Sequence, residues 1–411
     1  MKKRILLILA VLILASTFVP ALDVFVAAAN PPSVTATSAA VIDFASGEVL
    51  FSKDADRMRP PASMTKNVTA YIVYEEIAAG RLTLDTMITV GRNAVNLSTG
   101  HDWHSATVFR TVGAQHSVET MLRLIMLPSH NGSCIALAEH ISGSESAFVA
   151  RMNELMQRME INATFENSHG LWGNSVSALG MARFVRYFLT DFPDILRITA
   201  MRSMDFGGSS VPNTNRILSY AHIDGFKTGT TGAAGPCLSS TAFRGDVRVV
   251  AVTMNSSNTD TRFSDSLRLL NFGLDEAEYR AAERERERIA AEEAARVNVT
   301  IDGTQIEFDV HARTIDGSVM APVRAIAEAL GALVTWDGET ENVTITTVGG
   351  DVISAAIGSQ AVYINNISFE KSAASVLIGG RTFWPVRFTA ERLGASVIWD
   401  GDARTVHILS P

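Results

Sequence analysis

A charged stretch past the middle of the chain limits what the rest can fold into. Residues 274–297 are rich in glutamate, arginine and alanine, and so many charges cannot be buried in a core. Glu276–Arg280 and Glu292–Arg296 have the i, i+4 order that supports a solvated helix. No sustained heptad seam is present, which disfavours the alternative of a partner-binding coiled coil. The stretch therefore predicts a charged linker helix between two separately folded parts.

An internal repeat follows this linker, in residues 298–411. Pro322-Val323-Arg324 recurs 63 positions later as Pro385-Val386-Arg387, and Trp336-Asp337-Gly338 recurs as Trp399-Asp400-Gly401. Each copy predicts a short helix, a glycine stop and a hairpin that turns at Asp-Gly. Because two such units can bury their apolar faces against each other, the repeat predicts a small α+β module with both tryptophans in its core.

The part before the linker, residues 34–273, combines strands and helices. Its patterns predict, in chain order, a hairpin (40–44 and 48–51), a helix (64–79), two helices around a break at 128–131 (118–141) and two closing strands (237–243 and 247–254). Strands, then helices, then strands again favour an α+β domain.

The first 29 residues predict a secretory signal. Lys2, Lys3 and Arg4 precede the uncharged apolar run 5–19, and Ala27-Ala28-Ala29 supplies small residues for cleavage. The apolar run is short for a membrane-spanning helix, so an uncleaved anchor is the lesser alternative. The prediction is an extracytoplasmic protein.

Composition excludes several classes of protein. Apolar residues make up 47% of the 411 residues and charged residues 19%, which excludes a disordered chain. The net charge of −8 argues against a nucleic-acid partner. The only cysteines, Cys134 and Cys237, allow at most one disulfide, and buried thiols are favoured over that bond. So few cysteines in a secreted protein indicate a bacterial source.

Ser63 and Lys66 form the first candidate catalytic pair. Their i, i+3 spacing at the start of a predicted helix puts the hydroxyl and the amine on one face. A serine needs an adjacent base, and a lysine acts as one only when its pKa falls from about 10.4 toward neutrality. The helix N-terminus also offers backbone N–H groups to an oxyanion.

Order along the chain distinguishes this pair from a second match, Ser368…Lys371, which lies in a strand-like setting of the repeat. Ser63…Lys66 is followed by Ser129-His130-Asn131 at the helix break and by Lys227-Thr228-Gly229 before the closing strands. A second Ser-x-Asn, Ser256-Ser257-Asn258, follows a strand end and is interpreted as a turn. Lys227 is the only lysine followed by Ser or Thr and then Gly.

In this order the three motifs resemble those of the serine penicillin-binding proteins and β-lactamases. The sequences at 59–66, 136–144, 165–171 and 224–229 resemble the low-molecular-mass D-alanyl-D-alanine carboxypeptidases, peptidase family S11. The resemblance covers residues 34–273 and implies a transpeptidase-like fold, an antiparallel sheet flanked by helices with a helical subdomain. It implies a cell-wall enzyme that removes the terminal D-alanine from peptidoglycan stem peptides, uses no cofactor or metal, and is inhibited covalently by β-lactams.

The resemblance also implies roles for individual residues. Ser63 would form the acyl-enzyme, Lys66 would take its proton, and Ser129 would relay a proton to the leaving D-alanine. Asn131 would bind the substrate amide and hold Lys66. The substrate-binding strand would use Lys227, Thr228 and Thr230 for the terminal carboxylate, with Gly229 leaving room for the peptide. Backbone N–H groups of Ser63 and Thr230 would form the oxyanion hole.

The chain departs from the family pattern at Asn67, in place of an apolar residue, and at His130-Asn131-Gly132-Ser133, in place of a small residue followed by Asn-Asp-Ala.

A β-lactamase is the alternative enzyme, but the chain has no Glu-x-x-Leu-Asn segment, which would supply the glutamate that activates the deacylating water. A catalytically silent wall-binding protein is the other alternative, and the intact motifs argue against it.

Other residues suggest no chemistry. His101 and His104 lie in a loop without further ligands, and His169 is interpreted as structural. The repeat resembles the copper amine oxidase N-terminal domain of Gram-positive surface proteins, yet it offers only His311 and His407 as metal ligands. Residues 298–411 are therefore expected to act as a spacer or adhesion module that contacts cell-wall polymer, on a Gram-positive surface.

Overall fold

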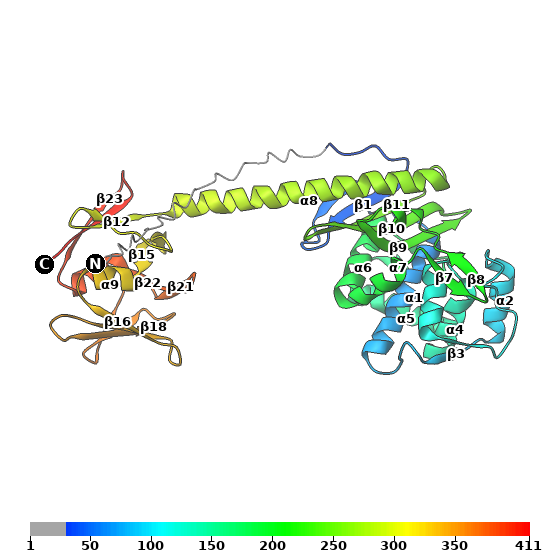
Figure 1. The fold of residues 1–411 in the computed structure, drawn as a ribbon, viewed down its shortest axis with the longest axis horizontal. Coiled ribbons are helices and arrows are strands. Elements are labelled where there is room, and N and C mark those ends of the chain that lie inside the picture. Colours follow the sequence, from blue (N-terminus) through cyan, green and yellow to red (C-terminus); the bar gives the residue numbers. More distant parts are fainter. Residues whose placement is uncertain (1–29) are drawn as a thin grey trace, which may run out of the picture. The chain divides into compact units, whose positions relative to one another are not determined.

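The computed structural model describes residues 30–411, so the predicted signal lies outside the described residues. The chain forms two compact units, the first ending at Ala282 and the second spanning Glu283–Pro411 (Figure 1). In the part of the chain that is described, no helix combines the length and the apolar character needed to cross a membrane.

The first unit is built on a five-stranded antiparallel sheet in the order β2-β1-β11-β10-β9. Its strands are β1 (Ser38–Asp43), β2 (Val49–Lys53), β9 (Ile223–Thr231), β10 (Gly235–Arg244) and β11 (Val247–Met254). The predicted hairpin and closing strand pair are confirmed, and β11 pairs with β1 so that the two ends of the domain meet. Strand β9 lies at one edge of the sheet.

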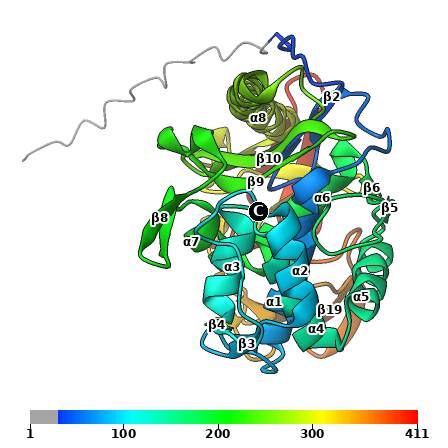
Figure 2. The same ribbon diagram turned by 90° about the vertical axis from the view of Figure 1, so that its right-hand side faces the viewer.

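Alternating side chains bury both faces of this sheet. Ile42 and Val250 contribute to a core with the helical subdomain, whereas the neighbouring Val41 and Val249 face a second core with helix α8 (Thr259–Ala295). Period-two alternation between two apolar layers is what a sheet covered on both faces requires. Figure 2 shows α8 on one side of β10 and β9, with α6 and α1 on the other.

The helical subdomain lies between β2 and β9 in the sequence. Its helices are η1 (Ala62–Thr65), α1 (Lys66–Ala78), α2 (Arg92–His101), α3 (Val118–Met126), α4 (Asn131–Ser142), α5 (Glu145–Arg158), α6 (Ala178–Asp191), η2 (Pro193–Ile195), α7 (Leu196–Thr199) and η3 (Arg216–Ser219). Two-stranded sheets pair β3 (Met87–Thr89) with β4 (Gln115–Ser117), β5 (Ala163–Thr164) with β6 (Ser175–Val176), and β7 (Ser203–Phe206) with β8 (Ser209–Pro212). The predicted break at 128–131 separates α3 from α4.

The charged stretch is helical, as predicted, but it continues a helix that starts earlier. Helix α8 begins at Thr259, and its first turns bury Leu269, Leu270 and Leu274 against the sheet. Beyond Ala277 the side chains of α8 are no longer buried, because glutamate and arginine replace the apolar stripe. The division between the two units falls within this helix.

The second unit is an α+β module, as the repeat predicted. It contains β12 (Asn298–Ile301), β13 (Thr304–Gln305), β14 (Arg313–Ile315), β15 (Ser318–Pro322), α9 (Val323–Ala329), β16 (Leu333–Asp337), β17 (Asn342–Thr346), β18 (Val352–Ala356), β19 (Ala361–Ile364), β20 (Ile367–Glu370), β21 (Val376–Ile378), β22 (Arg381–Pro385), α10 (Val386–Arg392), β23 (Ser396–Asp400) and β24 (Thr405–Leu409). Ile326 of α9 and Ala390 of α10 share one core, so the two copies bury apolar surface together.

The placement of the two repeat tryptophans in the core was wrong. Trp336 and Trp399 are each 44% exposed. Val334 is buried near the start of β16, but Trp336 lies close to the tip of the hairpin, where the small core ends. One side of β16 is therefore covered by the core at Val334 and exposed to solvent at Trp336.

Candidate active site

Ser63 lies in the 3-10 turn that leads directly into α1. The preceding Ala62 has a positive φ of 50°, an uncommon conformation for a residue with a side chain. Gly170 accommodates this turn, because a Cβ on Gly170 would lie 2.0 Å from the carbonyl oxygen of Ala62. Lys66 follows one turn later, with its Nζ 3.0 Å from Ser63 Oγ. The predicted pairing of hydroxyl and amine is thus present.

The Lys66 amine is fully buried and has two further fixed partners. It donates to Asn131 Oδ1 at 2.8 Å and to the backbone oxygen of His169 at 2.6 Å. Both partners can only accept, so a neutral amine would direct its two hydrogens to them and its lone pair to the Ser63 hydroxyl. Burial lowers the pKa of Lys66, which favours this neutral form. The geometry suits a general base.

Asn131 and Ser129 come from the break between α3 and α4. Ser129 has a positive φ of 69°, and Asn131 is the first residue of α4. Strained backbone of this kind persists where the surrounding structure fixes it. Asn131 Nδ2 donates to the backbone oxygen of His101 at 3.2 Å, which orients its Oδ1 toward Lys66. The break therefore supplies both side chains of the second motif.

A buried carboxylate accepts hydrogen bonds from the backbone at this break. Asp102, whose side chain is 2% exposed, accepts hydrogen bonds from the backbone N–H of Asn131 at 2.5 Å and of Gly132 at 3.3 Å. The backbone N–H of Ser133 donates to His130 Nδ1, so the His130 proton is on Nε2, 2.8 Å from Asp102 Oδ2. Burial alone would raise the pKa of Asp102, but the hydrogen bonds from His130 and Asn131 outweigh it and lower that pKa.

We predict that Asp102→Asn loosens the second motif without removing a reacting group. The amide nitrogen cannot accept from a backbone N–H, and hydrogen bonds to charged groups contribute about 1.5–3 kcal/mol each. The free energy of unfolding should fall by about 2 kcal/mol. The rate constant for acylation by penicillin should fall about tenfold, because Asn131 would position Lys66 less precisely. Urea unfolding and stopped-flow labelling measure both. The exposed Asp85→Asn is the control, and an Asp102→Asn protein as stable and as reactive as this control would contradict the assignment.

The third motif lies on the edge strand β9. Gly229 is packed so closely against the nucleophile turn that a Cβ would lie 2.7 Å from the oxygen of Pro61 and 3.0 Å from the nitrogen of Ser63. Thr228 and Thr230, on either side of it, line a pocket of about 290 Å³. Its lining also includes Ser63, Ser129, Asn131, His101, Trp103, Leu171, Thr214 and Arg262. The structure thus gathers residues of all three motifs around one pocket.

Two basic residues lie on the β9 side of the site, and of these Arg262 lines the pocket whereas Lys227 is buried behind it. Lys227 is fully buried, and its Nζ has no hydrogen-bond partner among the described residues. Burial and the neighbouring Lys66 lower the pKa of Lys227 well below its usual value. Arg262 of α8 donates from Nη1 to Thr230 Oγ1 at 2.9 Å and to the Gly229 oxygen at 3.2 Å. Burial lowers the pKa of Arg262 to about 10, so this guanidinium stays charged at neutral pH.

The departures from the family pattern have structural explanations. Asn67 Nδ2 donates to Ser239 Oγ at 3.0 Å and so ties α1 to strand β10. Gly132 lets α4 pack against α2, because a Cβ there would lie 2.8 Å from the Ala94 oxygen. Neither residue displaces a group of the three motifs.

Sequence reasoning missed Asp102 and Arg262. Asp102 lies within the loop sequence considered only for its histidines, and Arg262 opens a helix 32 residues after Thr230. Neither residue belongs to a local sequence motif. Asp102 reaches the site from the loop after α2, and Arg262 reaches it from the first turn of α8.

Both cysteines, His169 and Lys371 have structural roles. Cys134 and Cys237 are buried free thiols, as predicted. His169 contributes its backbone oxygen to Lys66, and burial lowers the pKa of its ring to about 3. The second serine–lysine match is not a catalytic pair, because the Lys371 amine donates to the backbone oxygens of residues 359–361 and lies over the Trp384 ring.

The second unit does not offer a copper site. His407 Nδ1 lies 2.9 Å from Thr300 Oγ1, and His311 is not grouped with other ligands. Within residues 30–411, no three His, Cys, Asp or Glu side chains gather as a metal would require. The residues present do not fit the metal that the domain name implies.

Comparison with known sequences identifies the family. The sequence model of the D-alanyl-D-alanine carboxypeptidase family, peptidase S11, matches residues 25–258. The chain belongs to this family. A second model, that of the copper amine oxidase N-terminal domain, matches residues 300–408. Both predicted resemblances are confirmed.

Individual relatives agree with this assignment. The chain is 35% identical over 248 residues to D-alanyl-D-alanine carboxypeptidase DacC of Escherichia coli, covering 59% of this chain and 62% of that protein. Penicillin-binding protein 6B of Escherichia coli has a similar structure, with a TM-score of 0.55 at 30% identity over 60% of this chain and 79% of that one. Penicillin-binding protein D2 of Listeria monocytogenes, in its ampicillin-bound form, gives 0.54 at 26% identity over 60% and 99%. The predicted transpeptidase-like fold is confirmed.

Proposed function

We propose that the chain is a serine-type D-Ala-D-Ala carboxypeptidase of peptidoglycan stem peptides. The observation that carries the proposal is the Lys66 amine, buried and 3.0 Å from Ser63 Oγ, with two acceptors that leave its lone pair for the serine hydroxyl. Membership of the S11 family supports the same activity.

Acylation would begin with transfer of the Ser63 proton to Lys66. Ser63 Oγ then bonds to the carbonyl carbon of the penultimate D-alanine, and the π electrons of that carbonyl move to its oxygen. We assign the backbone N–H groups of Ser63 and Thr230 to this oxyanion, since β9 lies directly against the nucleophile turn at Gly229. An extended peptide would lie along the edge of β9, where a strand can be added.

Collapse of this intermediate breaks the C–N bond to the terminal D-alanine. The leaving nitrogen needs a proton, and we assign the relay from Lys66 to Ser129, which lines the same pocket. Water then attacks the ester carbonyl carbon while Lys66 takes a proton from that water. The bond between this carbon and Ser63 Oγ breaks, the shortened peptide leaves with a carboxyl group, and Lys66 returns the proton to Ser63 Oγ.

The terminal carboxylate distinguishes a carboxypeptidase substrate from an internal peptide. We assign Thr228, Thr230 and Lys227 to it, and add the charged Arg262. A carboxylate beside Lys227 would also give its buried amine a hydrogen-bond acceptor, which the amine lacks among the described residues. β-Lactams would acylate Ser63 in the same way, and the similar Listeria protein is described with ampicillin bound.

We place the enzyme outside the cytoplasm of a Gram-positive bacterium, in cell-wall synthesis and the maintenance of cell shape. The signal-like segment 1–29 supports this location. We propose residues 34–273 as the catalytic domain, 274–297 as the linker and 298–411 as a module that contacts wall polymer.

The proposal is tested by two assays on the same purified protein. We expect sustained release of D-alanine from a diacyl-Lys-D-Ala-D-Ala peptide, and slow, near-stoichiometric reaction with a chromogenic cephalosporin. A β-lactamase would give the reverse, with rapid cephalosporin turnover and no release of D-alanine. Absence of both reactions would favour a silent wall-binding protein and overturn the proposal.

A further inference from the structure

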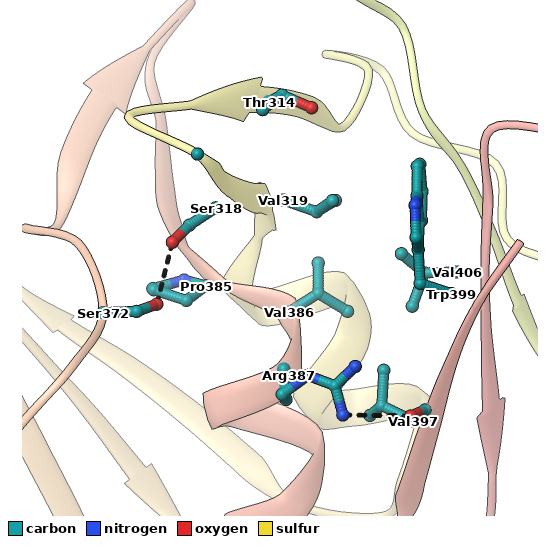
Figure 3. Close-up of a pocket in the computed structure, with 11 residues that line it drawn as sticks. Thr314, Ser318, Val319, Ser372, Pro385, Val386, Arg387, Val397, Trp399 and Val406 are labelled. Carbon is teal, nitrogen blue, oxygen red and sulfur yellow. Dashed lines mark hydrogen bonds between the residues drawn. The ribbon is translucent and has the colours of Figure 1, made fainter. Parts of the chain in front are cut away.

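The C-terminal module has two surface grooves with equivalent linings. The first groove, of about 540 Å³, is lined by Arg324, Val334 and Trp336 among others. The second groove, of about 500 Å³, is lined by Arg387, Val397 and Trp399, each 63 positions later. Figure 3 shows the second groove with the Trp399 ring along one side, Arg387 at another, and Val319 and Val386 between them.

A local twofold relation explains why the grooves are equivalent. Strands β15 and β22, one from each repeat, pair antiparallel in the centre of a four-stranded sheet, β14-β15-β22-β21. Ala321 and Trp384 are partners in this register and are also 63 positions apart. A residue paired with its own repeat equivalent marks a twofold axis, so each repeat builds one copy of the same groove.

Each groove holds its arginine in the same way. Arg324 Nη1 donates to the Val334 oxygen at 2.9 Å and to Glu328 at 3.1 Å. Arg387 Nη1 donates to the Val397 oxygen at 3.1 Å and to Glu391 at 3.3 Å. These contacts orient the guanidinium through Nη1, while Nε and Nη2 of both arginines have no hydrogen-bond partner among residues 30–411.

The two grooves differ at several equivalent positions, among them Thr314 and Leu377, and Val319 and Thr382. The second groove has Ser318 donating to Ser372 at 2.9 Å. The equivalent positions on the first-groove side are Arg381, which lines the groove, and Asp309, and they form an ion pair with Arg381 Nε 2.7 Å from the carboxylate. Both grooves share an exposed tryptophan, an arginine and a wall of valines, and the tryptophan and arginine offer a common ligand an aromatic face and hydrogen-bond donors.

We propose that the two grooves are equivalent binding sites for single sugar units of an acetylated amino-sugar glycan. The face of the indole, with its negative quadrupole, accepts the apolar C–H face of a pyranose ring. The free N–H groups of the arginine reach the hydroxyl and acetyl oxygens, and pockets of this kind combine an aromatic wall with a few placed donors. Acidic residues outnumber basic ones in residues 298–411, which disfavours a polyanionic polymer. The choice of glycan rests on the proposed wall function, whereas the existence of two sites does not.

The test is a titration of the full mature chain with soluble, peptide-free peptidoglycan oligosaccharide, followed by tryptophan fluorescence and calorimetry. We expect two sites in the wild type, one in Trp336→Ala or Trp399→Ala, and none in the double variant. Arg387→Gln should weaken its site about tenfold. Tyr363→Ala is the matched control, because Tyr363 is an exposed aromatic residue of the module that lines neither groove.

Three results would overturn the inference. They are no binding in the wild type, two sites retained in the double tryptophan variant, and tryptophan-dependent binding of a polyol-phosphate polymer instead of the glycan. Release of D-alanine from a soluble peptide, measured on the same variants, should match the wild type. Loss of D-alanine release with glycan binding intact would count against the proposed function alone.

Discussion

Replacing Lys66 by alanine is expected to slow acylation of Ser63 about 10³-fold, since a positioned general base contributes about 10²–10⁴. The amine is the only base within hydrogen-bond distance of Ser63 Oγ among the described residues, and its other two partners are acceptors. Stopped-flow measurement of acylation by a fluorescent penicillin gives the rate constant. Lys371→Ala, at the second serine–lysine match, is the control and should leave the rate unchanged.

Lys66→Arg separates the role of a base from that of a positive charge. A guanidinium keeps the charge but does not lose its proton in this pH range, so this variant should be as slow as Lys66→Ala. In the wild type, acylation should rise as increasing pH removes the proton from Lys66, whose pKa burial has lowered. An arginine variant with wild-type rate, or a wild-type rate that falls as pH rises through this ionisation, would exclude Lys66 as the base.

Gly229→Ala is expected to lower kcat/KM for the peptide substrate at least 10²-fold, since small displacements of reacting groups have effects of about this size. The added Cβ would lie 2.7 Å from the Pro61 oxygen and 3.0 Å from the Ser63 nitrogen, so the nucleophile turn and β9 must separate. This separation would widen the proposed oxyanion hole and displace Thr230.

The control for this variant is Gly232→Ala, in the turn after β9, where an added Cβ meets nothing within 4 Å. Steady-state release of D-alanine and thermal unfolding should be measured on both variants. If Gly229→Ala unfolds at the wild-type temperature and retains full activity, the close approach of β9 to Ser63 is not needed for catalysis.

The fold was predictable wherever the sequence alternates or repeats regularly. Residues Ala39–Ile42 contribute alternately to two apolar cores, and a short apolar run bounded by a turn can be recognised as a strand without coordinates. The start of α8 was not recognised, because the charged residues after Glu276 obscured an apolar stripe that begins at Phe263. The exposure of Trp336 depends on how far the small core extends along the strand. The alternation of residues in the sequence does not contain this information.

The site was predictable where chemistry requires particular residues in a particular order. Ser63, Ser129 and Gly229 come from three distant segments, and their order along the chain was enough to select them over the second serine–lysine match. Asp102 and Arg262 could not be predicted, because each reaches the site from an element whose own sequence carries no motif. Their contribution depends on packing between segments.

The most direct test of the central claim is mass spectrometry of the protein after incubation with penicillin. We predict one acyl adduct per chain, located by peptide mapping on Ser63, and no adduct on Ser63→Ala. Ser368→Ala, at the second match, should label like the wild type. An adduct on any other residue, or labelling that survives in Ser63→Ala, would contradict the assignment of Ser63 as the nucleophile.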